Sequence, residues 1–146
     1  MEKLPPVEKI YEAYTAIVDG RVIMQEDRAT VLSSGKEKEY TVTWKGNIYT
    51  STDSATYWQG YAGYPVIAVL MLQGRLPFDV DIAQRFKGVN WAALNKMHKR
   101  DYEKAAEEVF ESMKAEEKAK AKQEVQRVHV KIKELDVMVR RGKKSR

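Results

Sequence analysis

Apolar residues near the start of the chain recur every three or four positions, which is the spacing of one face of a helix. They are Val7, Ile10, Tyr14 and Ile17. Pro6 and Gly20 flank this pattern, and proline suits the first turn of a helix while glycine commonly ends one. The spacing therefore predicts a helix over about residues 6–18.

The pattern then changes to alternation over four short segments that are rich in β-branched and aromatic residues, 21–25, 29–34, 39–44 and 47–51. In the third segment Tyr40, Val42 and Trp44 fall on one face of a strand. Turn residues separate the segments. This organisation predicts a small antiparallel meander of three or four strands, with one face packed and the other exposed to water.

After residue 53 the spacing is helical again, and residues able to cap a helix precede the segments. These residues are Asp53 or Ser54, Asp79, Asn90 and Asp101. A helix, a meander and a helical half together predict an α+β fold. We expect a single domain over residues 1–139, followed by a basic tail over residues 140–146.

The last helical stretch has neither glycine nor proline from residue 102 to residue 141. Its second half carries an apolar stripe at heptad spacing, formed by Val125, Val128, Ile132, Leu135 and Val139. Between its halves lies a stretch rich in Lys, Glu and Ala, which has almost nothing to bury. The pattern favours a helical hairpin that bends near residues 114–120. The alternative is one long helix that forms a homodimer or binds a protein partner through the stripe.

Four aromatic residues and two glycines precede an unbroken apolar run from Pro65 to Leu72. The run is far shorter than the roughly 20 residues that span a membrane, so we expect no membrane partner. Pro65 and the glycines predict a short aromatic helix, a kink and a buried second helix over about residues 65–73. The aromatic residues either pack in the core or line a groove that stacks on bases or grips a peptide. They are Tyr57, Trp58, Tyr61 and Tyr64.

Positive charge is concentrated at the end of the chain. The net charge is +5, and the last seven residues carry five positive side chains, so the rest of the chain is neutral. A basic tail of this kind either binds phosphates without sequence preference or serves as a solvated terminus. The five residues are Arg140, Arg141, Lys143, Lys144 and Arg146.

A second basic cluster ends the segment 82–100, which loosely resembles a helix-turn-helix. Lys96, Lys99 and Arg100 would contact phosphates in that arrangement. The spacing from Ala83 to Gly88 is one residue longer than is usual for that motif. The apolar residues of the segment equally suit ordinary helix packing.

Catalytic and cofactor chemistry has little support in the sequence. The chain contains no cysteine, which excludes disulfides, thiolate catalysis and the usual cysteine-containing metal sites. The two histidines, His98 and His129, lie on different segments, and most carboxylates stand beside lysine on helix faces. We therefore expect no metal and no cofactor.

These patterns favour a non-enzymatic protein that binds RNA or DNA, or that associates with the ribosome. A protein-interaction module and an enzyme of unfamiliar type are the alternatives. The start of the chain lacks the features of a secretory or transit peptide, so a cytoplasmic location is expected. The absence of cysteine and the dominance of Lys and Glu among the charges also suit a thermophile.

Overall fold

A computed structural model of the chain describes residues 1–143. It begins with helix α1 (Glu8–Val18) and continues with strands β1 (Val22–Met24), β2 (Arg28–Leu32), β3 (Glu39–Lys45) and β4 (Ile48–Ser51). Each of these strands pairs antiparallel with the next. The structure thus confirms the predicted N-terminal helix and the meander of an α+β fold.

A fifth strand, β5 (Met138–Arg141), completes the sheet at the outer edge of β4 and runs parallel to it. The Met138 N–H donates to the Asn47 carbonyl at 2.9 Å, and the Gly142 N–H donates to the Ser51 carbonyl at 2.7 Å. Two expectations from the sequence are therefore wrong. Val139 does not continue a helical stripe, and Arg140 and Arg141 belong to a strand and not to a tail.

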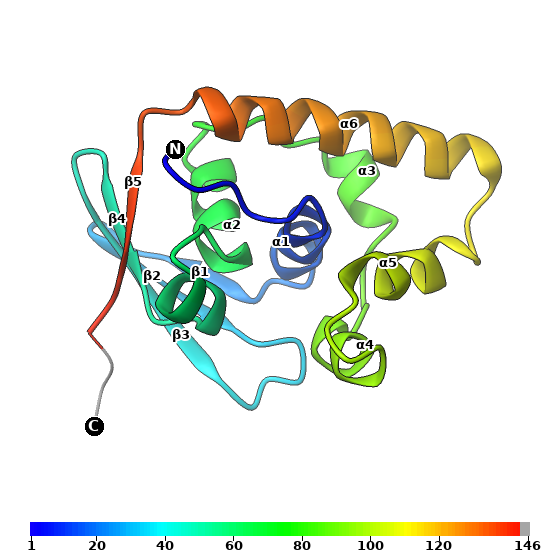
Figure 1. Cartoon of the computed structure of the whole chain (residues 1–146), viewed down its shortest axis with the longest axis horizontal. Coiled ribbons are helices and arrows are strands. Elements are labelled where there is room, and N and C mark those ends of the chain that lie inside the picture. Colours follow the sequence, from blue (N-terminus) through cyan, green and yellow to red (C-terminus); the bar gives the residue numbers. More distant parts are fainter. Residues whose placement is uncertain (144–146) are drawn as a thin grey trace.

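The aromatic segment forms a short π-helix, η1 (Ala55–Gln59), which Gly60 ends in a left-handed conformation with φ of 77°. Helix α2 (Tyr64–Leu72) follows, and its residues from Pro65 to Met71 are buried. It packs between α1 and the sheet (Figure 1). The predicted short helix, kink and buried second helix are confirmed. No helix within residues 1–143 is both long enough and apolar enough to cross a membrane.

The remaining helices are α3 (Val80–Gln84), α4 (Trp91–Met97), α5 (Tyr102–Phe110) and α6 (Ala115–Glu134). The expected caps are present in three of them, because the side chains of Asp79, Asn90 and Asp101 each accept a hydrogen bond from the backbone N–H three residues later. Figure 1 shows α6 running along one side of the helical half.

The final helical stretch is two helices and not one. The chain turns between Phe110 and Ala115, which is earlier than the predicted bend at residues 114–120. The Lys114 N–H donates to the Glu117 carboxylate at 3.1 Å, and Glu107 of α5 holds Lys118 and Lys122 of α6 through ion pairs. These bonds hold the Lys/Glu/Ala stretch in the first turns of α6, although the stretch buries little apolar surface.

The apolar stripe packs inside the chain. Val125, Val128 and Ile132 are fully buried in the core, and Leu135 is half-buried where α6 ends. Val139 is buried too, as part of β5. The chain itself therefore covers these side chains, and this placement does not support their predicted role as an interface with a partner.

Candidate nucleic-acid interface

Strand β5 carries Arg141 to the side of η1. Val139 and Arg141 are two residues apart and so point to the same face of the strand. Val139 is buried in the core on that face, and β5 contacts η1 there. The Arg141 guanidinium consequently lies 4.6 Å from the centre of the Tyr57 ring and 5.8 Å from that of Trp58.

Tyr57 and Trp58 form an edge-on pair, with ring centres 4.7 Å apart and planes at 71°. Tyr57 is half-buried, whereas Trp58 is 65% exposed, which is unusual for so large an apolar side chain. A cation over aromatic faces is attracted by the negative potential of the rings. We call Tyr57, Trp58 and Arg141 the Trp58 platform.

A buried polar network holds the backbone of η1. The Asp53 carboxylate accepts hydrogen bonds from the Thr56 N–H, at 3.1 Å, and from the Ser51 hydroxyl. The Thr56 hydroxyl in turn accepts from the Gly63 N–H at 3.0 Å. All of these groups are buried, so the network ties η1 to the end of β4 and to the start of α2.

The N-terminal segment adds a cation beside the platform. The Lys3 ammonium donates to the Gln59 carbonyl and lies 5.7 Å from the centre of the Tyr61 ring. Tyr61 is half-buried near Tyr102, and burial raises the pKa of its hydroxyl. Lys3 could not be identified from the sequence, because nothing in its local pattern distinguishes it from any other surface lysine.

The other basic residues of the predicted tail that the structure describes, Arg140 and Lys143, are not part of the platform. Arg140 points away from the face that Val139 and Arg141 share, and its Nη2 lies 3.6 Å from Oε1 of Glu2, which offsets its charge. Lys143 is exposed just beyond β5. Lys144 and Arg146 lie outside the described residues.

Tyr64 is not part of the platform. It begins α2, packs edge-on against Tyr40 and lies 6.0 Å from the Arg21 guanidinium. Burial raises the pKa of its hydroxyl well above the usual range. The aromatic group predicted from the sequence is therefore divided between a surface site and the packed interior.

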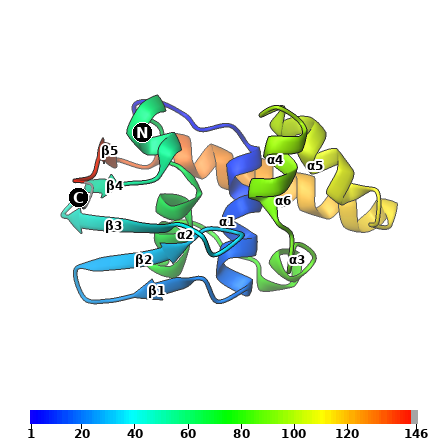
Figure 2. The same cartoon turned by 90° about the horizontal axis from the view of Figure 1, so that it is seen from below.

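The predicted phosphate contacts Lys96, Lys99 and Arg100 lie at the end of α4, which Figures 1 and 2 both place away from β5. The structure does not support a helix-turn-helix here. Trp91, at the start of α4, is fully buried and donates to the Thr15 hydroxyl at 2.8 Å. A recognition helix presents its first turn to the bases, whereas the first turn of α4 is anchored in the core by Trp91.

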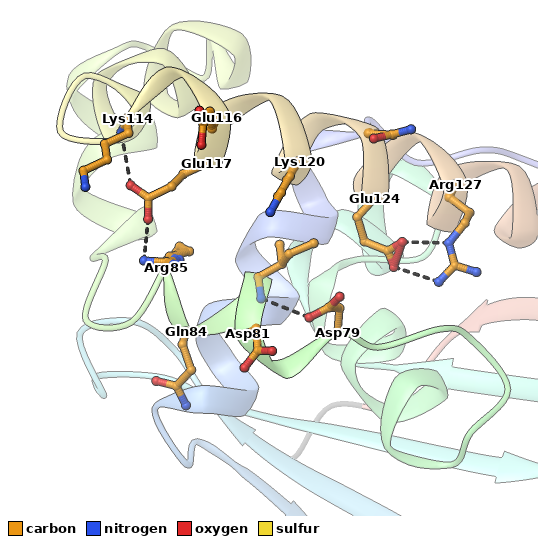
Figure 3. Close-up of a pocket in the computed structure, with 12 residues that line it drawn as sticks. Asp79, Asp81, Gln84, Arg85, Lys114, Glu116, Glu117, Lys120, Glu124 and Arg127 are labelled. Atoms are coloured by element: carbon orange, nitrogen blue, oxygen red, sulfur yellow. Dashed lines mark hydrogen bonds and ion pairs between the residues drawn. The ribbon is translucent and has the colours of Figure 1, made fainter.

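A hollow of about 1140 Å³ lies between α3 and α6 and is lined mainly by charged residues (Figure 3). Much of its charge is already paired, since Arg85 binds Glu117 and Arg127 binds Glu124. Within residues 1–143, no three His, Asp or Glu side chains are grouped so that they could hold a metal ion. A hollow with both signs of charge and open sides selects no class of ligand, so we do not assign it a function.

A buried ion pair is the remaining candidate for chemistry. The Lys9 ammonium lies 3.1 Å from the Glu12 carboxylate and 4.1 Å from the centre of the Tyr102 ring. Burial raises the pKa of Glu12, against the opposing effect of Lys9. Both side chains are less than a tenth exposed, which leaves no room for a substrate beside them. We therefore assign the pair to stability and not to catalysis.

The chain was compared with known families, curated proteins and solved structures, and it matches a family model. The sequence model of the family described as "Uncharacterised conserved protein UCP014422" matches residues 2–138. None of the curated proteins and none of the solved structures matches the chain. The matched stretch includes Tyr57 and Trp58 and ends before Arg141.

Proposed function

We propose that this protein, which belongs to the family described as "Uncharacterised conserved protein UCP014422", binds single-stranded nucleic acid through the Trp58 platform. The observation that carries the proposal is the position of the Arg141 guanidinium over the Tyr57 and Trp58 rings, beside a tryptophan that is 65% exposed. Proteins that bind single strands combine such aromatic surfaces with cations.

The platform offers the two contacts that a nucleotide needs. An unstacked base can lie on the exposed surface of Trp58, and the Arg141 guanidinium can pair with the adjoining phosphate while it supports the rings. Lys3 adds a second cation within the same surface. Bases in a duplex are stacked on one another and do not reach such a ring, so the platform favours single strands. Since every base has an aromatic face, little sequence preference is expected.

The Trp58→Ala variant is expected to bind a single-stranded oligonucleotide about tenfold more weakly than the unchanged chain, because stacking contributes on the order of 1–3 kcal/mol per base. Trp58→Phe should keep most of the affinity, since it keeps an aromatic face. Fluorescence anisotropy of a labelled oligonucleotide measures both. The exposed ring contributes little to folding, so the melting temperatures should agree. Equal affinities of the alanine and phenylalanine variants would contradict the proposal.

The Arg141→Ala variant is expected to reduce the salt dependence of binding. The slope of log K against log salt is negative, and one lost phosphate contact on a single strand reduces its magnitude by about 0.7. Lys45→Ala is the matched control, because Lys45 is an exposed cation of the same sheet that lies at the opposite end of β4. The proposal requires a smaller slope for Arg141→Ala than for Lys45→Ala in the same salt series.

A further inference from the structure

We infer that the Trp58 platform is one end of a track for a single strand, which continues along the N-terminal segment to the α4–α5 turn (residues 98–101). There the side chains of Lys99 and Arg100 bind a phosphate several nucleotides away from the base on Trp58. The inference rests on the proposed function and extends it, because it assigns the protein a longer ligand than one or two nucleotides.

Neighbouring residues connect the two ends of the track. Lys3 joins the platform to Tyr61, since its ammonium donates to the Gln59 carbonyl and lies 5.7 Å from the Tyr61 ring centre. The Tyr61 hydroxyl lies near that of Tyr102, the first residue of α5. Arg100 precedes Tyr102 by two residues. Figure 2 shows η1, the N-terminal segment and the α4–α5 pair along its upper edge, and in Figure 1 the N-terminal segment lies above the other two and nearer to α6.

The α4–α5 turn holds two neighbouring cations in an unusual backbone conformation. Lys99 and Arg100 have φ of 53° and 66°, in the left-handed region that favours glycine. The Arg100 N–H donates to the Asn95 carbonyl at 2.7 Å, and the Asp101 N–H donates to the His98 carbonyl at 3.0 Å, which fixes the turn. Strained residues of this kind concentrate at binding sites. Two exposed cations stand where two glycines would fit without strain.

The turn and the end of α4 carry more positive than negative side chains, which favours the binding of an anion. Among residues 1–143, the side chains of Lys96, Lys99 and Arg100 form no hydrogen bond and no ion pair. Within residues 96–101 the one acid is Asp101, whose carboxylate caps α5; Glu103 and Glu108 follow on α5, and Glu108 lies 3.4 Å from His98. These positive side chains without partners stand two to six residues before the half-buried Tyr102, and cations and aromatic rings together suit the phosphates and bases of a single strand.

The test compares two lengths of oligothymidine, about 4 and about 16 nucleotides, the range of site sizes seen for single-strand-binding folds. With the long oligonucleotide, log K falls as log salt rises, and Lys99→Gln/Arg100→Gln is expected to reduce the magnitude of this negative slope by about 1.4, because two phosphate contacts are lost. Binding of the short oligonucleotide, which fits on the platform alone, should not change. Lys45→Gln/Lys87→Gln removes two exposed cations elsewhere and should change neither.

The outcomes separate this inference from the proposed function. If Trp58→Ala weakens binding of both lengths while Lys99→Gln/Arg100→Gln matches its control with the long one, the track is wrong and the platform stands. If Trp58→Ala changes neither length, both proposals fail. A second variant, Lys99→Gly/Arg100→Gly, suits the left-handed backbone and so keeps the turn folded. It should lose the same long-oligonucleotide binding, and retained binding would overturn the track.

Discussion

Replacing Lys9 with methionine is expected to destabilise the folded chain by about 3–5 kcal/mol at neutral pH. Methionine fills similar space but leaves the buried Glu12 carboxylate without its cation, at a site where both side chains are less than a tenth exposed. It also removes the ammonium from the Tyr102 ring, 4.1 Å away. Equilibrium unfolding in urea, followed by circular dichroism, measures the loss.

The double variant Lys9→Met/Glu12→Gln is the control, because it removes the uncompensated charge together with its partner. We expect it to recover most of the lost stability. If the double variant is as unstable as Lys9→Met, the cost comes from packing and not from the stranded carboxylate.

The effect of Lys9→Met should also depend on pH. Burial raises the pKa of Glu12 in the folded chain above the ordinary glutamate value, and loss of the Lys9 ammonium, which opposes that shift, raises it further. A group with a raised folded pKa contributes stability below its unfolded pKa and loses that contribution as the pH rises through the folded pKa. The variant should therefore be closest to the unchanged chain in acid and fall furthest behind it at neutral pH. A deficit that is constant with pH would contradict this account.

The fold could be predicted from the sequence wherever its signals are local. The alternation of residues 39–44 is contained within one strand. The capping side chains of Asn90 and Asp101 bind backbone N–H groups only three residues further along the chain. Strand β5 has no such signal. The spacing of Leu135 and Val139 fits a helix, whereas the spacing of Val137 and Val139 fits a strand. The strand forms because the edge of β4 is available for pairing. That edge lies about 90 residues earlier in the chain and forms a parallel pairing, which no local turn announces.

In the candidate site, too, the local features could be predicted and the long-range contacts could not. Tyr57, Trp58 and Arg141 were each identifiable as aromatic or basic candidates, but their proximity depends on β5 and so could not be predicted. The sequence places Tyr64 in the same short aromatic stretch and does not show which of its rings stay at the surface. Gly60, with φ of 77°, ends η1, and Tyr64 lies beyond it at the start of α2.

Replacing Gly63 with alanine is expected to cost about 3 kcal/mol of stability and to weaken binding at the platform. A Cβ at this position would lie 1.9 Å from Oδ2 and 2.7 Å from Cγ of Asp53. Asp53 cannot move aside freely, because it is buried and its carboxylate holds the Ser51 hydroxyl and the Thr56 N–H. Either the backbone shifts or those bonds break, and both disturb the backbone that positions Tyr57 and Trp58.

Gly35→Ala is the matched control, since its Cβ would meet nothing nearer than the Glu37 side chain at 3.8 Å. It should change stability by less than about 1 kcal/mol and leave binding unchanged. Urea unfolding and oligonucleotide anisotropy, measured on the same preparations under conditions where both variants are folded, separate the two effects. If Gly63→Ala is destabilised but binds as Gly35→Ala does, Asp53 supports the fold without positioning the platform. If the two variants are equally stable, the buried network around Asp53 does not restrain η1.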